Sequence, residues 1–110
     1  MKLEVERINK DAVIRASGRL DMNTSPALRK AALRLYTNSG CKNLIVDLTE
    51  VSFIDTSALA TLIEILVAAK EQCAHLTLCG LNENVRYLID VNGLTGFFRI
   101  ESSTREELRV

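Results

Sequence analysis

The chain has 110 residues, 47% of them apolar, and its 14 basic residues balance 14 acidic ones. This length fits one domain, residues 1–110, with its own hydrophobic core, and the balanced charge provides no attraction toward nucleic acid or anionic lipid. No apolar stretch is long enough for a transmembrane helix, and the first ten residues lack the apolar segment of a signal peptide. The three cysteines lack CxxC spacing, which favours reduced thiols in a cytoplasmic protein and argues against a metal site.

The N-terminal segment predicts a β-hairpin. Leu3, Val5 and Ile8 are separated by charged residues and form the first expected strand, and residues 13–16 form the second. A turn around residues 9–11 joins the two strands, so we expect them to pair antiparallel.

The next two elements are a helix and a buried strand. Ser25 followed by Pro26 predicts a helix start, with the serine as N-cap and the proline at the first helical position. The helix is expected to end at residues 38–40, where Gly40 suits a left-handed cap. Residues 43–48 form a nearly continuous apolar run, which is typical of a central strand covered on both faces.

A second helix is predicted from about Ser57 to Gln72, and its apolar residues extend around most of its circumference. Its expected core face consists of four residues at helical spacing: Leu59, Leu62, Ile63 and Leu66. Ile65 falls at the margin of the narrow polar stripe, next to Ala58 and Ala69. We therefore expect these three residues to form an exposed apolar patch for a partner, unless another helix covers them.

The remaining elements complete an α/β pattern. Residues 75–79 predict a strand, and Asn82 can cap a third helix after it. Residues 97–100 suggest a last short strand, and residues 104–110 suggest a short tail helix. Strands followed by helices imply right-handed crossovers. We expect a single domain with a mixed sheet of about four to five strands, an N-terminal antiparallel hairpin, and helices packed mainly on one face.

The turn Asp55-Thr56-Ser57 is the most informative candidate site. Three side chains with oxygen atoms lie where the second helix is expected to begin. One interpretation is that they only cap the free N–H groups of the first helical turn. The other is that a hydroxyl at this place accepts a phosphate, which the N–H groups and the helix dipole would stabilise.

Three segments resemble the STAS family, the domain of bacterial anti-sigma factor antagonists. They are SGRLD at residues 17–21, LIVDLTEVSFIDTSALATL at residues 44–62, and LTLCGLNENVRYLIDVNGL at residues 76–94. The resemblance implies that Thr56, directly after Asp55, is the phosphorylation site, with Ser57 as second choice. In this chain threonine replaces the commoner serine, and Ala58 occupies a position usually held by glycine.

The resemblance implies partner switching without catalysis by the domain itself. The unphosphorylated domain is expected to bind an anti-sigma factor that is also a serine/threonine kinase, and so to free the sigma factor. The kinase then phosphorylates the domain with ATP, and a phosphatase resets it. The domain needs no cofactor and is expected to be a monomer or weak dimer. The expected partner-binding residues are Asp21, Asn23, Asp55, Thr56, Ser57, Ala58, Thr61 and Ile65.

The sequence bears on three other functions. A non-switching STAS subunit of an ABC-type lipid transporter, or of a sensor complex, also fits the segment DTSALATL at residues 55–62. An enzyme is disfavoured because His75 is the only histidine and belongs to a different strand from Thr56 and Ser57, so no nucleophile and base pair is visible. Nucleic-acid binding is disfavoured because the basic residues do not outnumber the acidic ones.

Overall fold

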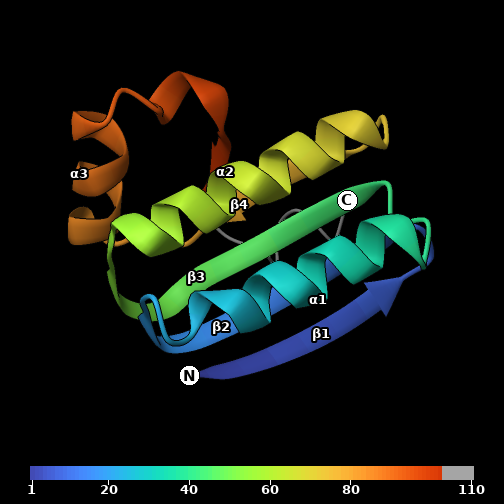
Figure 1. Cartoon of the computed structure of the whole chain (residues 1–110), viewed down its shortest axis with the longest axis horizontal. Coiled ribbons are helices and arrows are strands. Elements are labelled where there is room, and N and C mark those ends of the chain that lie inside the picture. Colours follow the sequence, from blue (N-terminus) through green and yellow to red (C-terminus); the bar gives the residue numbers. More distant parts are fainter. Residues whose placement is uncertain (103–110) are drawn as a thin grey trace.

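The computed structural model describes residues 1–102, which form one α/β domain with a five-stranded mixed sheet (Figure 1). The expected tail helix at residues 104–110 lies outside the described residues. The elements in chain order are β1 (Lys2–Ile8), β2 (Asp11–Leu20), α1 (Ser25–Thr37), β3 (Asn43–Ile54), α2 (Thr56–Glu71), β4 (His75–Cys79), α3 (Glu83–Val91), the 3-10 helix η1 (Thr95–Phe97) and β5 (Arg99–Glu101).

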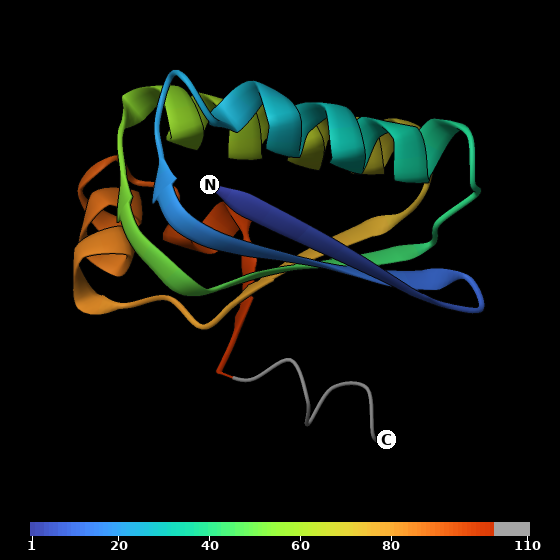
Figure 2. The same ribbon diagram turned by 90° about the horizontal axis from the view of Figure 1, so that it is seen from below.

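The strands lie in the sheet in the same order as in the chain, β1-β2-β3-β4-β5. β1 pairs antiparallel with β2, and every other neighbouring pair is parallel. Helices α1 and α2 lie side by side on one face of the sheet, and α3 lies at one end (Figure 2). This arrangement confirms the predicted fold class, the hairpin and the central position of β3.

The start of α1 differs from the prediction by one residue. Ser25 is the first helical residue and Thr24 is the N-cap, so the prediction that Ser25 caps the helix is wrong. Thr24 makes no side-chain capping bond, because its hydroxyl oxygen accepts a hydrogen bond from the Asp21 amide at 2.9 Å and lies 2.8 Å from the Arg19 carbonyl oxygen. At the other end, Gly40 has the expected left-handed backbone, with φ of +65°.

Strand β3 is twice as long as the expected residues 43–48. Its second half, residues 49–54, pairs with the end of β2, where Leu20 lies opposite Ile54. Parallel strands that end in register place their following loops next to each other. The connection from β2 to α1 therefore lies beside the start of α2, at the carboxyl edge of the sheet.

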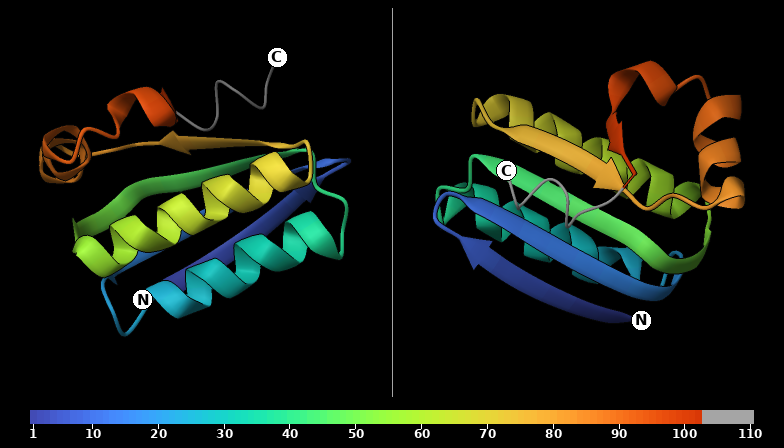
Figure 3. Two further views of the ribbon diagram at one scale, coloured as in Figure 1. Left: turned by 45° about the horizontal axis from the view of Figure 1, so that its top comes forward. Right: turned by 180° about the vertical axis from the view of Figure 1, so that it is seen from behind.

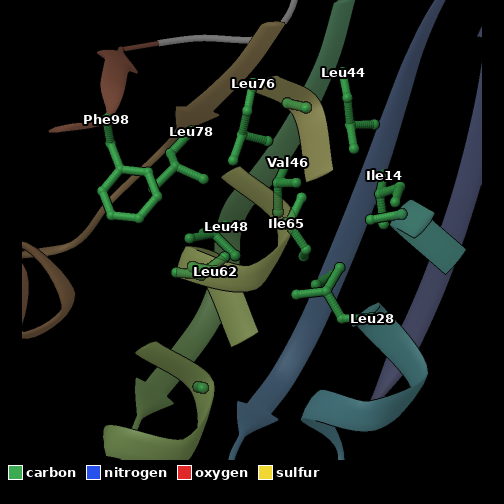
Figure 4. Packing of buried hydrophobic residues seen from close by; sticks show 14 of the residues in the cluster. Ile14, Leu28, Leu44, Val46, Leu48, Leu62, Ile65, Leu76, Leu78 and Phe98 are labelled. Atoms are coloured by element: carbon green, nitrogen blue, oxygen red, sulfur yellow. The ribbon is translucent and has the colours of Figure 1, made fainter. Parts of the chain in front are cut away.

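The main core fills the space between the sheet and the two helices (Figure 4). Successive residues of β3 alternate between the two faces, so Leu44, Val46 and Leu48 point toward the helices while Ile45 belongs to a small cluster on the opposite face. Ile65 of α2 lies in the main core and has no solvent exposure.

The expected exposed patch on α2 is therefore wrong. Ala58 and Ile65 are fully buried and Ala69 is 1% exposed, because α1 packs along this side of α2 (Figure 3). Thr61, expected in the polar stripe, is buried as well, whereas Ile63, expected in the core, is 37% exposed. Helix α2 buries one side against the sheet and another against α1, so its exposed stripe is rotated from the predicted position.

Candidate functional site

Asp55 joins the end of β3 to the start of α2 and caps the helix. Its backbone is extended, and its Oδ1 atom accepts a hydrogen bond from the Ala58 amide at 2.9 Å. The Asp55 carbonyl accepts the first helical bond from the Leu59 amide at 3.1 Å. An aspartate in this position satisfies one of the free N–H groups and complements the positive end of the helix dipole.

The second carboxylate oxygen of Asp55 reaches a different loop. Its Oδ2 atom accepts a hydrogen bond from the Met22 amide at 3.2 Å, and the Asp55 amide donates to the Leu20 carbonyl at 3.3 Å. Asp55 therefore holds the β2–α1 connection against the N-terminus of α2. Replacing the carboxylate would remove a helix cap and a link between two loops at once.

Thr56 and Ser57 are the first two residues of α2, and their hydroxyls are available. Thr56 is exposed and Ser57 is half-buried. Within residues 1–102, neither hydroxyl makes a hydrogen bond, and the backbone amides of both residues have no hydrogen-bond acceptor. A phosphate on Thr56 would therefore lie at the positive end of a 16-residue helix, near two amides that can donate to it.

Asp21 organises the neighbouring loop. Its Oδ1 atom accepts hydrogen bonds from the amides of Asn23 at 2.9 Å and Thr24 at 3.2 Å. The bond from the Asn23 amide is the main reason that the pKa of the Asp21 carboxyl is lowered, with further contributions from Thr24 and from the nearby Arg19 guanidinium. The loop leaves Asn23 exposed and the Met22 side chain 68% exposed, directly beside the Asp55 turn.

We expect acid to remove the stability that the ionised Asp21 carboxylate gives to this loop. Because the pKa of Asp21 is lower in the folded state than in the unfolded chain, the stabilisation is fully present above the unfolded pKa and is lost as the pH falls through the folded one. We expect carbon-detected NMR to place the Asp21 carboxyl pKa below the ordinary aspartate value. The Asp21→Asn variant should lose part of the acid dependence of unfolding. An ordinary pKa for Asp21 would contradict the assigned hydrogen bonds.

Two exposed side chains near this loop were not anticipated from the sequence. The Arg19 guanidinium lies 4.2 Å from the centre of the Phe53 ring, which is 38% exposed. Arg19 also lies 3.9 Å from the Asp21 carboxylate. The contact joins the ends of β2 and β3, and it extends the polar site into a surface with one aromatic face.

The structure brings five of the eight expected partner-binding residues to one accessible surface: Asp21, Asn23, Asp55, Thr56 and Ser57. The other three, Ala58, Thr61 and Ile65, are at most 5% exposed and cannot touch a partner in this conformation. Met22 joins the set because its amide is bonded to Asp55 and its side chain projects into solvent. A main-chain contact of this kind leaves no pattern in the sequence.

Neither a metal centre nor a membrane span is evident in the part of the chain that the structure describes. Residues 1–102 contain no group of three or more His, Cys, Asp or Glu side chains placed to hold a metal ion. None of the helices in the same range is long and apolar enough to cross a membrane. The functional groups at the carboxyl edge of the sheet are the exposed Thr56 hydroxyl, backbone amides, and the carboxylates of Asp21 and Asp55.

Comparison with known proteins identifies the family. The sequence model of the STAS domain matches residues 2–107. The chain belongs to the STAS-domain family. The anti-sigma-B factor antagonist of Staphylococcus epidermidis is 27% identical over 109 residues, which cover 97% of this STAS domain and all of the relative.

Solved structures of bacterial regulatory proteins share the fold. An anti-sigma factor antagonist from Mycobacterium paratuberculosis superimposes with a TM-score of 0.83 at 23% identity, covering 98% of this chain and 91% of that one. The Bacillus cell fate determinant SpoIIAA in its phosphorylated form gives a TM-score of 0.78 at 18% identity, covering 97% and 96%. These similarities confirm the predicted architecture, and the family match over residues 2–107 confirms the STAS resemblance.

Proposed function

We propose that this STAS domain is an anti-sigma factor antagonist whose binding is switched by phosphorylation of Thr56. Relatives that align over nearly the whole chain carry the name anti-sigma-B factor antagonist, which supports the antagonist role. The observation that carries the switch is the exposed, unbonded Thr56 hydroxyl at the first position of α2, next to the Asp55 cap. A protein partner that covers this turn would sense any charge added there.

The proposed partner is an anti-sigma factor that is also a serine/threonine kinase. In the transfer step, the Thr56 oxygen attacks the γ-phosphorus of ATP held by the kinase, the bond to the β-phosphate oxygen breaks, and ADP leaves. A base on the kinase takes the hydroxyl proton. A phosphatase later hydrolyses the phosphothreonine to threonine and inorganic phosphate. The STAS domain is a substrate in both steps and catalyses neither.

The site explains why the domain would stay folded after modification. The phosphate adds about −1.5 to −2 charges at neutral pH, next to the carboxylate of Asp55. Within the domain, the amides of Thr56 and Ser57 and the helix dipole offset this repulsion. A partner surface that accommodates the unphosphorylated turn has no such compensation, so the added charge weakens binding more than it weakens the fold.

Phosphorylation itself provides the first test. We expect incubation with the cognate kinase and ATP to add one phosphate, which peptide mass spectrometry should locate on Thr56. Thr56→Ala should abolish the modification, whereas Ser57→Ala, one residue further along the same helix, should leave it intact. A phosphate on Ser57 would move the acceptor by one position, and a phosphate far from this turn would contradict the proposed switch.

The same site distinguishes the transporter-subunit alternative. A STAS subunit that uses the threonine only for contact has no need to lose its partner when a charge is added. Binding that persists in a Thr56→Glu variant would therefore favour a non-switching subunit of a transporter or sensor complex over an antagonist. A loss of binding in that variant supports the switch.

A further inference from the structure

The exposed side of α2 carries an apolar stripe that begins at the proposed phosphorylation site. Thr56, Ala60, Ile63 and Val67 follow one another at intervals of four, three and four residues, so they lie along one side of the helix. All four are exposed, and Val67 is 50% exposed. This stripe replaces the patch that the sequence suggested, and it stays partly open to solvent in residues 1–102.

An apolar groove runs along the C-terminal half of this stripe. It has a volume of about 240 Å³ and lies between α2 and the segment that connects α3 to β5. Its walls include Ile63 and Val67 on one side and Leu94, Phe97 and Phe98 on the other. Phe97 is 62% exposed, although an aromatic ring of this size gains much from burial. Exposed apolar surface concentrated in one groove is typical of an interaction site.

A second depression borders the opposite side of the stripe. It has a volume of about 340 Å³ and is lined by α1 and α2, including the ion pair between Arg29 and Glu64. Ile63 and Val67 line both depressions and so form the ridge between them. A partner segment that packs on this ridge would have an apolar groove on one side and, on the other, a depression that combines apolar and charged side chains.

The positive charge of the groove indicates which kind of partner segment can bind in it. Among the described residues that line the groove, Lys70 alone is charged, and it forms no ion pair with any other residue of 1–102. A matching segment should present apolar side chains to Val67 and Phe97 and a carboxylate to Lys70. This is the pattern of an amphipathic helix that docks in a groove.

We infer that this groove binds an amphipathic, acidic helix of the anti-sigma factor, as a second contact in addition to the Thr56 turn. The inference rests on the proposed function, because the partner is the same. Val67 lies eleven positions after Thr56, which is about 16 Å along a helix and exceeds the screening length of roughly 8 Å at physiological salt. The phosphate therefore acts on one end of the interface, and the groove contributes equally in both states.

The test replaces each of two exposed valines in the full chain and measures the affinity of each variant for the purified anti-sigma factor of the source organism. Val67→Gln should weaken binding roughly tenfold, as expected when a polar amide replaces an apolar side chain at the centre of an interface. Val91→Gln is the matched control, because Val91 is 55% exposed at the end of α3 and does not line the groove. Glutamine suits a helix better than valine, so neither change should unfold the domain.

Charge reversal tests the second half of the inference. Lys70→Glu should weaken binding several-fold, whereas Lys30→Glu, an exposed lysine on α1 outside the groove, should not. Equal effects of the two reversals would show general electrostatic attraction and overturn the specific contact. Wild-type affinity in Val67→Gln would overturn the groove contact outright.

Combining changes separates this inference from the switch. Val67→Gln should reduce affinity by the same factor in Thr56→Ala and Thr56→Glu backgrounds, because sites this far apart act additively. If Thr56→Glu binds as well as Thr56→Ala while Val67→Gln still weakens binding, the switch fails and the groove stands. If Val67→Gln changes only self-association in sedimentation experiments, the groove binds a second copy of this chain and the inference is wrong.

Discussion

The Ile65→Asp variant is expected to be strongly destabilised at 25 °C. Ile65 is fully buried between the sheet and α1, so the substitution removes a packed side chain and places a carboxylate where water is excluded (Figure 4). Together these effects should lower the free energy of unfolding by at least about 4 kcal/mol, against the roughly 5–15 kcal/mol of a typical domain. Urea unfolding followed by circular dichroism measures this loss.

Ile63→Asp is the matched control on the same helix. It makes the same chemical change two residues earlier, at a side chain that is 37% exposed. We expect it to cost about 1 kcal/mol or less, as surface substitutions usually do. Equal stability of the two variants would mean that α2 is rotated from the described orientation, and that Ile65 is available to a partner after all.

The Thr56→Glu variant should bind the anti-sigma factor at least about fivefold more weakly than Thr56→Ala, which should bind nearly as well as the wild type. Glutamate adds one negative charge near Asp55, and a charge facing a closely packed partner costs about 1–3 kcal/mol. Within the domain, the effect has the opposite sign, because an acidic residue in the first turn of α2 is favourable by about 0.3–1 kcal/mol. Isothermal titration calorimetry and thermal unfolding measure the two effects separately.

Because Thr56→Glu should weaken binding but not lower stability, unfolding of the variant can be excluded as the cause of weaker binding. Weaker binding together with an unchanged or raised melting temperature cannot come from unfolding. Ser57→Glu provides the positional control, since Ser57 is half-buried in the same turn. Equal affinities of Thr56→Glu and Thr56→Ala would contradict an electrostatic switch. A lowered melting temperature in Thr56→Glu would contradict the described geometry of the helix start.

Local signals predicted most of the fold. The asparagine at the β1–β2 turn has φ of +57°, and the Asn82 side chain caps α3 by accepting from the Val85 amide at 2.9 Å. Both features depend on neighbouring residues only, so a sequence reveals them. The second half of β3 was missed because Thr49 and Glu50 interrupt the apolar run, and their strand conformation depends on pairing with β2.

The orientation of α2 was less predictable for a physical reason. Apolar residues surround most of this helix, so its periodicity alone does not identify the solvent side. The position of α1 determines which side of α2 faces solvent, because α1 covers Ala58 and Ile65 and leaves Ile63 and Val67 exposed. That information comes from packing between segments roughly thirty residues apart, which a pattern within one helix does not contain.

The candidate site was predictable as a list of residues but not as an assembly. The capping residues at the start of α2 were visible in the sequence, and the family resemblance selected Thr56 over Ser57. The hydrogen bond from the Met22 amide to Asp55 joins residues 33 positions apart through a main-chain group. No side-chain pattern encodes such a bond, so only the structure shows that Asp21, Asp55 and Thr56 share one surface.

The identical order of strands in the sheet and in the chain has a consequence for how the protein is made. Each strand after the first adds next to the one synthesised just before it, so no strand must wait for a later segment to be completed. Pairings between consecutive strands enclose less of the chain than pairings between distant strands would, and closing a shorter loop costs less conformational entropy. The nascent chain can therefore build its sheet from one edge to the other while it leaves the ribosome, which limits the time that an unpaired edge is open to aggregation.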